Sequence, residues 1–194
     1  DGVLELHRVA VGEHILLGGD NMDLALAYAV AGKLAAQGSK LDAWQLRALT
    51  HACRSAKETL LGDPEIAAVP LVVASRGAKL IGGSIRSELT REELTATLLE
   101  GFFPAAAIAD RPQGRGRGGL TQLGLPYAQD AAVTRHLAAF LARQLAATAD
   151  LEGFVGELPD DATFLHPTAV LFNGGVFKSD LLAERTLATI NSWL

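Results

Sequence analysis

The sequence predicts an α/β fold for this 194-residue chain, and three kinds of pattern support that prediction. Short apolar or β-branched runs at 3–11, 15–17 and 168–172 have the length and composition of strands. Several longer segments place apolar residues three and four positions apart, as amphipathic helices do. Two further apolar runs flank residues 76–78, which is typical of a β-hairpin. The order of these elements indicates a mixed sheet with a helical and hairpin excursion.

The first two predicted strands lead to Gly18-Gly19, and a helix is expected over 22–37. Asp20 or Asn21 can cap that helix, and Gly38 ends it. Asp42, with Gln45 three residues later, has the spacing of a capping box and predicts a second helix over 42–61. The apolar face of this helix carries Leu46, Leu49, Cys53, Ala56 and Leu60.

The hairpin is predicted over 67–75 and 79–85, with Pro70 marking an edge strand because proline has no N–H to donate. Thr90 and Glu93 form a second capping-box pattern, which predicts a helix to about Gly101. Residues 102–129 are rich in Gly, Pro and Arg and predict a long insertion. Asp130 is expected to cap a helix that ends near Thr148.

The last predicted unit is an apolar, buried strand at 169–172, a turn at Asn173-Gly174-Gly175, and a helix from Lys178 or Ser179 to Trp193. Glycines let the backbone turn sharply and approach a ligand closely, because no Cβ intervenes. In open α/β sheets a ligand lies at such a strand end, near a helix N-terminus. Taken alone, the turn is more typical of a tight connection without a ligand.

The composition of the chain argues against several classes of function. An apolar content of 49% is ample for a core, while no apolar run has the roughly 20 residues that a membrane-spanning helix needs. The net charge of −5 argues against a general nucleic-acid binder. Cys53 is the single cysteine, so we expect a reducing, cytoplasmic setting, and the five histidines lack metal-ligand spacing. The first residues are already typical of a strand, and the last helix stops without a glycine cap, so we expect a piece of a longer protein.

Four segments, in this order, resemble the heat-shock-70 (DnaK-type) chaperone family in its actin-like ATPase domain. Leu17-Gly18-Gly19-Asp20-Asn21-Met22-Asp23 is similar to the family's Leu-Gly-Gly-Glu-Asp-Phe-Asp, and residues 52–60 resemble its helix Ala-Cys-Glu-Arg-Ala-Lys-Arg-Thr-Leu. Residues 85–94 resemble its Ile-Thr-Arg segment and the helix that follows. Residues 170–178 resemble its Val-Leu-Val-Gly-Gly-Ser-Thr-Arg.

The resemblance implies lobe II of that fold. Residues 1–17 and 129–194 would form a sheet-bearing subdomain, 18–105 an inserted helix-and-hairpin subdomain, and 106–128 an insertion. It also implies binding of ATP or ADP, coupled to closure of the two lobes, in a cytoplasmic bacterial-type chaperone. The implied partners are the nucleotide, the rest of the parent ATPase domain, and a co-chaperone or client protein, without a membrane or nucleic acid.

In the family, adenine lies between the lysine-bearing helix and the second Gly-Gly loop. The nucleotide-binding positions carried over are Gly18, Gly19, Asp20, Lys57, Gly174, Gly175 and Lys178, the last in place of an arginine. Lysine lacks the planar guanidinium that can stack on a base. The helix departs from the family at three positions: Arg54 replaces a glutamate, Glu58 an arginine and Leu61 a serine.

The family's phosphate-binding turns, Mg²⁺ ligands and catalytic lysine belong to the part of the chain before Asp1. Phosphoryl transfer depends on those groups, so no catalytic residue or metal ligand is assigned and this chain alone is expected to have no ATPase activity. Two alternatives stay open. One is a nucleotide-independent interaction module whose pocket Arg54, Glu58 and Leu61 have abolished. The other is an actin-like kinase of small molecules.

Overall fold

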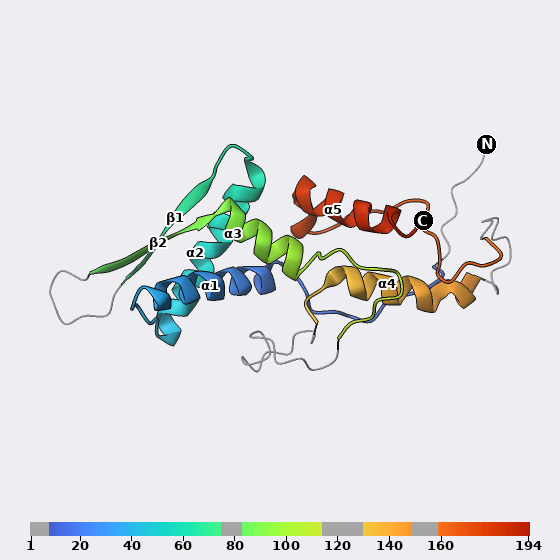
Figure 1. Cartoon of the computed structure of the whole chain (residues 1–194), viewed down its shortest axis with the longest axis horizontal. Helices are drawn as coiled ribbons and strands as arrows, with labels where there is room; N and C mark the ends of the chain where they lie inside the picture. The colour runs from blue at the N-terminus through green and yellow to red at the C-terminus, as the bar shows by residue number, and fades with distance from the viewer. Residues whose placement is uncertain (1–7, 75–82, 114–129, 149–158) are drawn as a thin grey trace.

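The computed structural model describes residues 8–74, 83–113, 130–148 and 159–194, and shows a mixed α/β chain. One end of the molecule holds helices α1 and α2, the hairpin and α3, while α4 and α5 lie toward the other end (Figure 1). The segment after α3 runs from the first group to the region of α4 and α5. Helices α2, α4 and α5 are amphipathic, as the sequence pattern predicts, whereas the apolar residues of α1 are not concentrated on one face.

Helix α1 (Gly19–Ala36) and helix α2 (Ala43–Gly62) confirm the two helices predicted in the first third of the chain. The N-cap of α1 is Gly18 rather than Asp20 or Asn21, so that prediction is wrong by two or three residues. Asn21 lies inside the first turn and helps to cap the helix, because its Oδ1 accepts a hydrogen bond from the Gly18 N–H at 3.1 Å. The capping box of α2 is confirmed, with Gln45 N–H donating to Asp42 Oδ1 at 2.8 Å.

Strands β1 (Ala68–Ala74) and β2 (Ser84–Thr90) pair antiparallel, with Val72 opposite Arg86 in the middle of the register. The hairpin is therefore confirmed, but its second strand was expected over 79–85 and begins only at Ser84. Residues 79–82 lie outside the described residues. The alternation of β2, with Ile85, Ser87 and Leu89 less exposed than their neighbours, is the period-2 pattern that marks the observed strand.

Helix α3 (Arg91–Thr95) continues as a π-helical turn η1 (Ala96–Glu100), which confirms the predicted helix and its Thr90–Glu93 capping box. Lys33 of α1 reaches this box, because its Nζ lies 2.8 Å from Glu93 Oε1. Burial alone would raise the pKa of Glu93, but the hydrogen bonds from Lys33 and from the Thr90 backbone outweigh burial and lower it.

The main core lies at the helix-and-hairpin end of the molecule. It is formed by the inward faces of α1, α2, the hairpin, α3 and η1, closed by Phe102, Phe103 and Leu182. Burying side chains of this size stabilises the fold by roughly 1.5–3 kcal/mol each before the conformational entropy cost is subtracted. Leu182 belongs to α5, so the core also includes a residue from the C-terminal part of the chain.

Helix α4 (Val133–Gln144) is followed by a 3-10 turn η3 (Leu145–Thr148), and a 3-10 turn η4 (Val176–Lys178) precedes helix α5 (Asp180–Asn191). Both helices confirm the sequence prediction, except that α4 is capped at Ala132 and not at Asp130. Backbone carbonyls of residues 102–104 accept hydrogen bonds from both helices. The Val133 N–H donates to Phe102 O at 2.8 Å and Arg185 Nε donates to Phe103 O at 2.9 Å.

The predicted strands outside the hairpin are not formed in the described residues. Residues 8–17 and 169–172 have no regular secondary structure, and residues 3–7 lie outside the described part. The strand after Pro167 was also expected to be buried, yet Leu171 is 94% exposed. A strand is defined by hydrogen bonds to a neighbouring strand, and the described residues contain only the β1–β2 pair. Most of the predicted 102–129 insertion also lies outside the described residues, from 114 onward.

Within the described ranges, no helix combines the length and the apolar character needed to cross a membrane.

Candidate functional site

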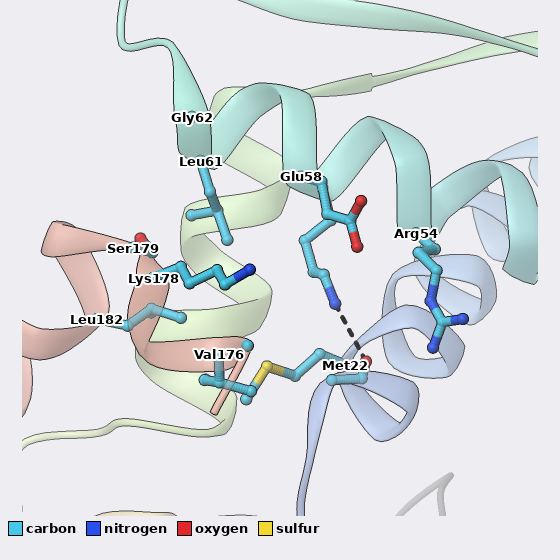
Figure 2. Close-up of a pocket in the computed structure, with 12 residues that line it drawn as sticks. Met22, Arg54, Glu58, Leu61, Gly62, Val176, Lys178, Ser179 and Leu182 are labelled. Atoms are coloured by element: carbon cyan, nitrogen blue, oxygen red, sulfur yellow. Dashed lines mark hydrogen bonds between the residues drawn. The ribbon is translucent and has the colours of Figure 1, made fainter. Parts of the chain in front are cut away.

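A cavity of about 530 Å³ lies between α1, the second half of α2, and the segment from Gly175 to Leu182. Figure 2 shows how these three segments, which are far apart in the sequence, face one another across it. The lining combines glycine backbone, charged side chains and apolar side chains. It consists of Gly19, Met22, Arg54, Lys57, Glu58, Leu61, Gly62, Gly175, Val176, Lys178, Ser179 and Leu182.

Four of the seven residues carried over from the family resemblance line this cavity: Gly19, Lys57, Gly175 and Lys178. Gly18 and Gly174 line an adjoining hollow of about 320 Å³, which shares Gly19 and Gly175 with the main cavity. Asp20 lines neither of these two spaces. The structure thus brings the two Gly-Gly turns and the lysine-bearing helix together, with Asp20 at the side.

The second Gly-Gly turn requires glycine at one of its two positions. Gly174 has a φ of +94°, a left-handed conformation that side chains with a Cβ rarely adopt. Gly175 is the N-cap of η4 with a φ of −67°, which any residue can adopt. A Cβ added at Gly175 would meet nothing within 4 Å, so its side of the cavity is open to close approach by a ligand.

Lys57 is almost buried, and its ammonium is already occupied by the protein. Its Nζ donates a hydrogen bond to Gly19 O at 3.2 Å and lies 2.6 Å from Asp23 Oδ1, in an ion pair without hydrogen-bond geometry. A Cβ added at Gly19 would come within 3.3 Å of the same Nζ. The close packing of Gly19 against Lys57 explains why glycine suits the first turn of α1.

Arg54 lies one turn before Glu58 on α2 and binds the carboxylates of α1. Its Nε donates to Asp23 Oδ2 at 3.0 Å, and its Nη2 pairs with Asp20. The pKa of Arg54 is raised above its ordinary value, first by the hydrogen bond to Asp23 and then by the charges of Asp20, Asp23 and Glu58. Arg54 therefore remains a cation directed at α1.

Asp23 is the central residue of this cluster, and the sequence analysis did not single it out. Its side chain is 3% exposed and contacts both Arg54 and Lys57. The available signal was its place within the Gly-Gly segment of α1, one turn after Asp20. Met22, Val176 and Leu182 were also missed, because apolar periodicity assigns such residues to a core rather than to a cavity wall. Ser179 was considered only as a possible start of the last helix.

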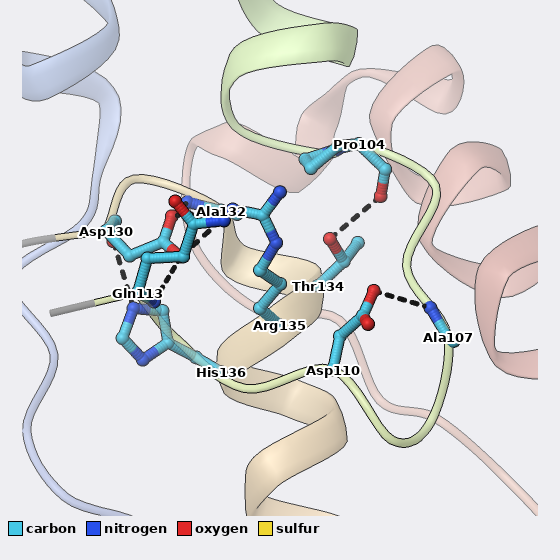
Figure 3. A network of polar contacts seen from close by, with 9 residues as sticks. All are labelled: Pro104, Ala107, Asp110, Gln113, Asp130, Ala132, Thr134, Arg135 and His136. Carbon is cyan, nitrogen blue, oxygen red and sulfur yellow. Dashed lines mark hydrogen bonds and ion pairs between the residues drawn. The ribbon is translucent and has the colours of Figure 1, made fainter. Parts of the chain in front are cut away.

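A second polar network surrounds Asp130 (Figure 3), and none of its residues lines the cavity. Its carboxylate accepts hydrogen bonds from the backbone N–H of Gln113 at 2.8 Å and of Ala132 at 2.9 Å, and pairs with Arg135 at 3.0 Å. Burial would raise the pKa of Asp130, but these donors outweigh it and hold the pKa below its ordinary value. The network fixes residue 113 beside residue 130 and supports the start of α4.

The described residues contain no group of three or more His, Cys, Asp or Glu side chains placed to hold a metal ion. Comparisons with models of protein families, with characterised proteins and with solved structures found no match to the chain.

Proposed function

We propose that this chain is the adenosine-side portion of the nucleotide-binding domain of a heat-shock-70-like molecular chaperone ATPase. In this proposal ATP or ADP occupies the 530 Å³ cavity, and its binding is coupled to closure of two lobes of an actin-like fold. The observation that carries the proposal is the meeting of Gly19, Lys57, Gly175 and Lys178 around one cavity. Only the resemblance predicted that these positions would share a site.

The dimensions and chemistry of the cavity support the proposal. Small-molecule sites have volumes of about 300–1,000 Å³ and combine apolar walls with a few polar groups that orient the ligand. Here Met22, Leu61, Val176 and Leu182 offer apolar surface for a flat ring, and Lys178 and Glu58 add charged groups. Phosphates and Mg²⁺ would be held mainly by the part of the parent protein that precedes Asp1.

Isothermal titration calorimetry of the complete protein with ATP and ADP tests the proposal. We expect saturable binding of both nucleotides, weakened at least tenfold by Gly175→Val, which places a branched side chain in the cavity. Leu194→Ala, at an exposed residue outside the cavity, is the matched control and should bind as the wild type does. Absence of nucleotide binding would exclude the proposed function.

The isolated 194-residue chain should hydrolyse no ATP, and turnover by it would show that the chain itself holds catalytic groups.

A second candidate is a nucleotide-independent interaction module, and one observation favours it. Arg54 and Lys57 are both engaged by Asp20, Asp23 and Gly19, so neither is free for a ligand in this structure. The calorimetric titration separates the two candidates, because the module would give no heat with either nucleotide while still binding a co-chaperone or client protein.

A further inference from the structure

Among the described residues that line the cavity, Ser179 alone carries a hydroxyl, and the Oγ of that hydroxyl has no hydrogen-bond partner in the described part of the chain. The residue is only 5% exposed. A buried hydroxyl without a partner destabilises the folded chain, because its hydrogen bonds to water are lost and nothing replaces them. Ser179 therefore has unused hydrogen-bonding capacity at the wall of a cavity.

The first turn of α5 faces the same cavity and also has unused donors. Lys178, Ser179 and Leu182 all line the cavity, so the helix begins at its wall (Figure 2). Ser179 is the N-cap of this 12-residue helix, yet its side chain makes no capping hydrogen bond. The Ala183 N–H donates to Ser179 O at 3.2 Å, which leaves the N–H groups of residues 180–182 without a partner inside the helix. Such free N–H groups give a helix N-terminus a partial positive charge that attracts anions.

The charged side chains around this turn also favour an anion. Lys178 makes no hydrogen bond or ion pair with the described residues, and in Figure 2 it extends from η4 toward α2. Asp180 is exposed and does not line the cavity, and Glu58 belongs to α2 on the opposite wall. The charge that the α5 side of the cavity offers to a ligand is therefore the Lys178 ammonium.

We propose that the start of α5 is a binding site for an oxyanion of the phosphate type, held by the Ser179 hydroxyl and the free N–H groups of the first turn. Lys178 adds an ammonium on a flexible stem. The resemblance to the chaperone family covers residues 170–178 and assigns no role to Ser179. The site does not depend on the proposed nucleotide binding, because its oxyanion is either a phosphate group of a nucleotide or a separate anion.

Thermal unfolding of the complete protein in inorganic phosphate, at constant ionic strength, tests the site. We expect phosphate to raise the unfolding temperature to a plateau, because a ligand of the folded state stabilises it. Ser179→Ala should weaken phosphate binding about tenfold, since it removes a hydrogen bond to a charged group. Lys178→Gln should weaken it about threefold, because an exposed ammonium contributes less. The matched controls Ser55→Ala and Lys40→Gln remove the same groups from exposed positions outside the cavity and should bind phosphate as the wild type does.

The stability of the ligand-free variant is a second measurement. Without phosphate, Ser179→Ala should unfold at a temperature no lower than that of the wild type, because the hydroxyl that it removes has no partner among the described residues. A lower unfolding temperature would show that the hydroxyl caps α5 instead of serving a ligand, and would overturn the proposal.

The outcomes separate this site from the proposed function. No stabilisation by phosphate, or equal phosphate affinity in the wild type and Ser179→Ala, would overturn the oxyanion site whether or not ADP binds. Binding of phosphate without binding of ADP would overturn the proposed function and support the site. Where both bind, calorimetric titration with ADP at saturating phosphate identifies the source of the oxyanion. Competition indicates a phosphate group of the nucleotide, unchanged ADP affinity indicates a separate anion, and both results support the site.

Discussion

Asp23 Oδ1 lies 2.6 Å from Lys57 Nζ, and this contact joins α1 to α2 at the wall of the cavity. Asp23 is 3% and Lys57 10% exposed, so both charges have lost most of their water. Such a pair is costly to break from one side only, because the remaining charge stays buried without a partner. The contact therefore does two things: it fixes the helices relative to each other, and it occupies the lysine that the family resemblance assigns to the ligand.

We predict that Asp23→Ala destabilises the chain by about 3 kcal/mol, because it leaves the Lys57 ammonium buried and uncompensated. Urea unfolding followed by circular dichroism measures the loss. Asp20→Ala is the matched control, since Asp20 is 76% exposed and, among the residues that the structure describes, pairs only with Arg54 across the surface. It should cost less than about 1 kcal/mol. Equal costs for the two variants would mean that Asp23 contributes no more than a surface charge does.

The helices were predictable from sequence because their signals are local. Asp42 with Gln45 and Thr90 with Glu93 form capping boxes within four residues, and both are present in the structure. Strands depend on partners that are distant in the chain, so the apolar run before Asn173 indicated a strand that the described residues do not pair.

The candidate site was predictable only in part. The resemblance predicted that Gly19, Lys57 and Gly175 share a site, and in the structure these three residues line one cavity. The ion pair of Asp23 with Lys57 joins residues 34 positions apart on two helices, and no local sequence pattern predicts such a pair.

The two glycines of the second turn should respond differently to alanine. Gly174→Ala forces a Cβ into a left-handed conformation and should lower the unfolding free energy by about 1–2 kcal/mol. Gly175→Ala, at a φ of −67° with open space around it, should leave stability within about 0.5 kcal/mol of the wild type. Chemical denaturation of both variants measures the difference. A stable Gly174→Ala variant would show that the turn does not need the left-handed conformation.

Cys53 should be unreactive in the folded chain. It is fully buried in the core, and burial, with a smaller effect of the Asp23 charge, raises the pKa of its thiol to about 12. The thiolate is the reactive form, so almost none is present at pH 8. We expect reaction with a chromogenic disulfide reagent to be at least a hundredfold slower in buffer than in 8 M urea. Rapid labelling of the native protein would instead indicate frequent local opening of α2.

Asp130 should make stability depend on pH at the acid end. Its pKa is lowered from the ordinary value of 3.8 in the folded chain, because the Gln113 and Ala132 N–H groups and Arg135 outweigh burial. A lowered folded pKa means that the stabilisation is present above pH 3.8 and is lost as the pH falls through the folded pKa.

Asp130→Asn should therefore lower the unfolding free energy by about 2 kcal/mol at pH 7 and flatten its decline below pH 4. Denaturant titrations from pH 7 to pH 3 measure both effects. Asp160→Asn, at an exposed position, is the control and should keep the wild-type acid dependence. If the unfolding free energy of Asp130→Asn declines with falling pH as steeply as that of the wild type, the acid sensitivity arises from other carboxylates. Glu93 is the first of these to test, because its pKa is also lowered.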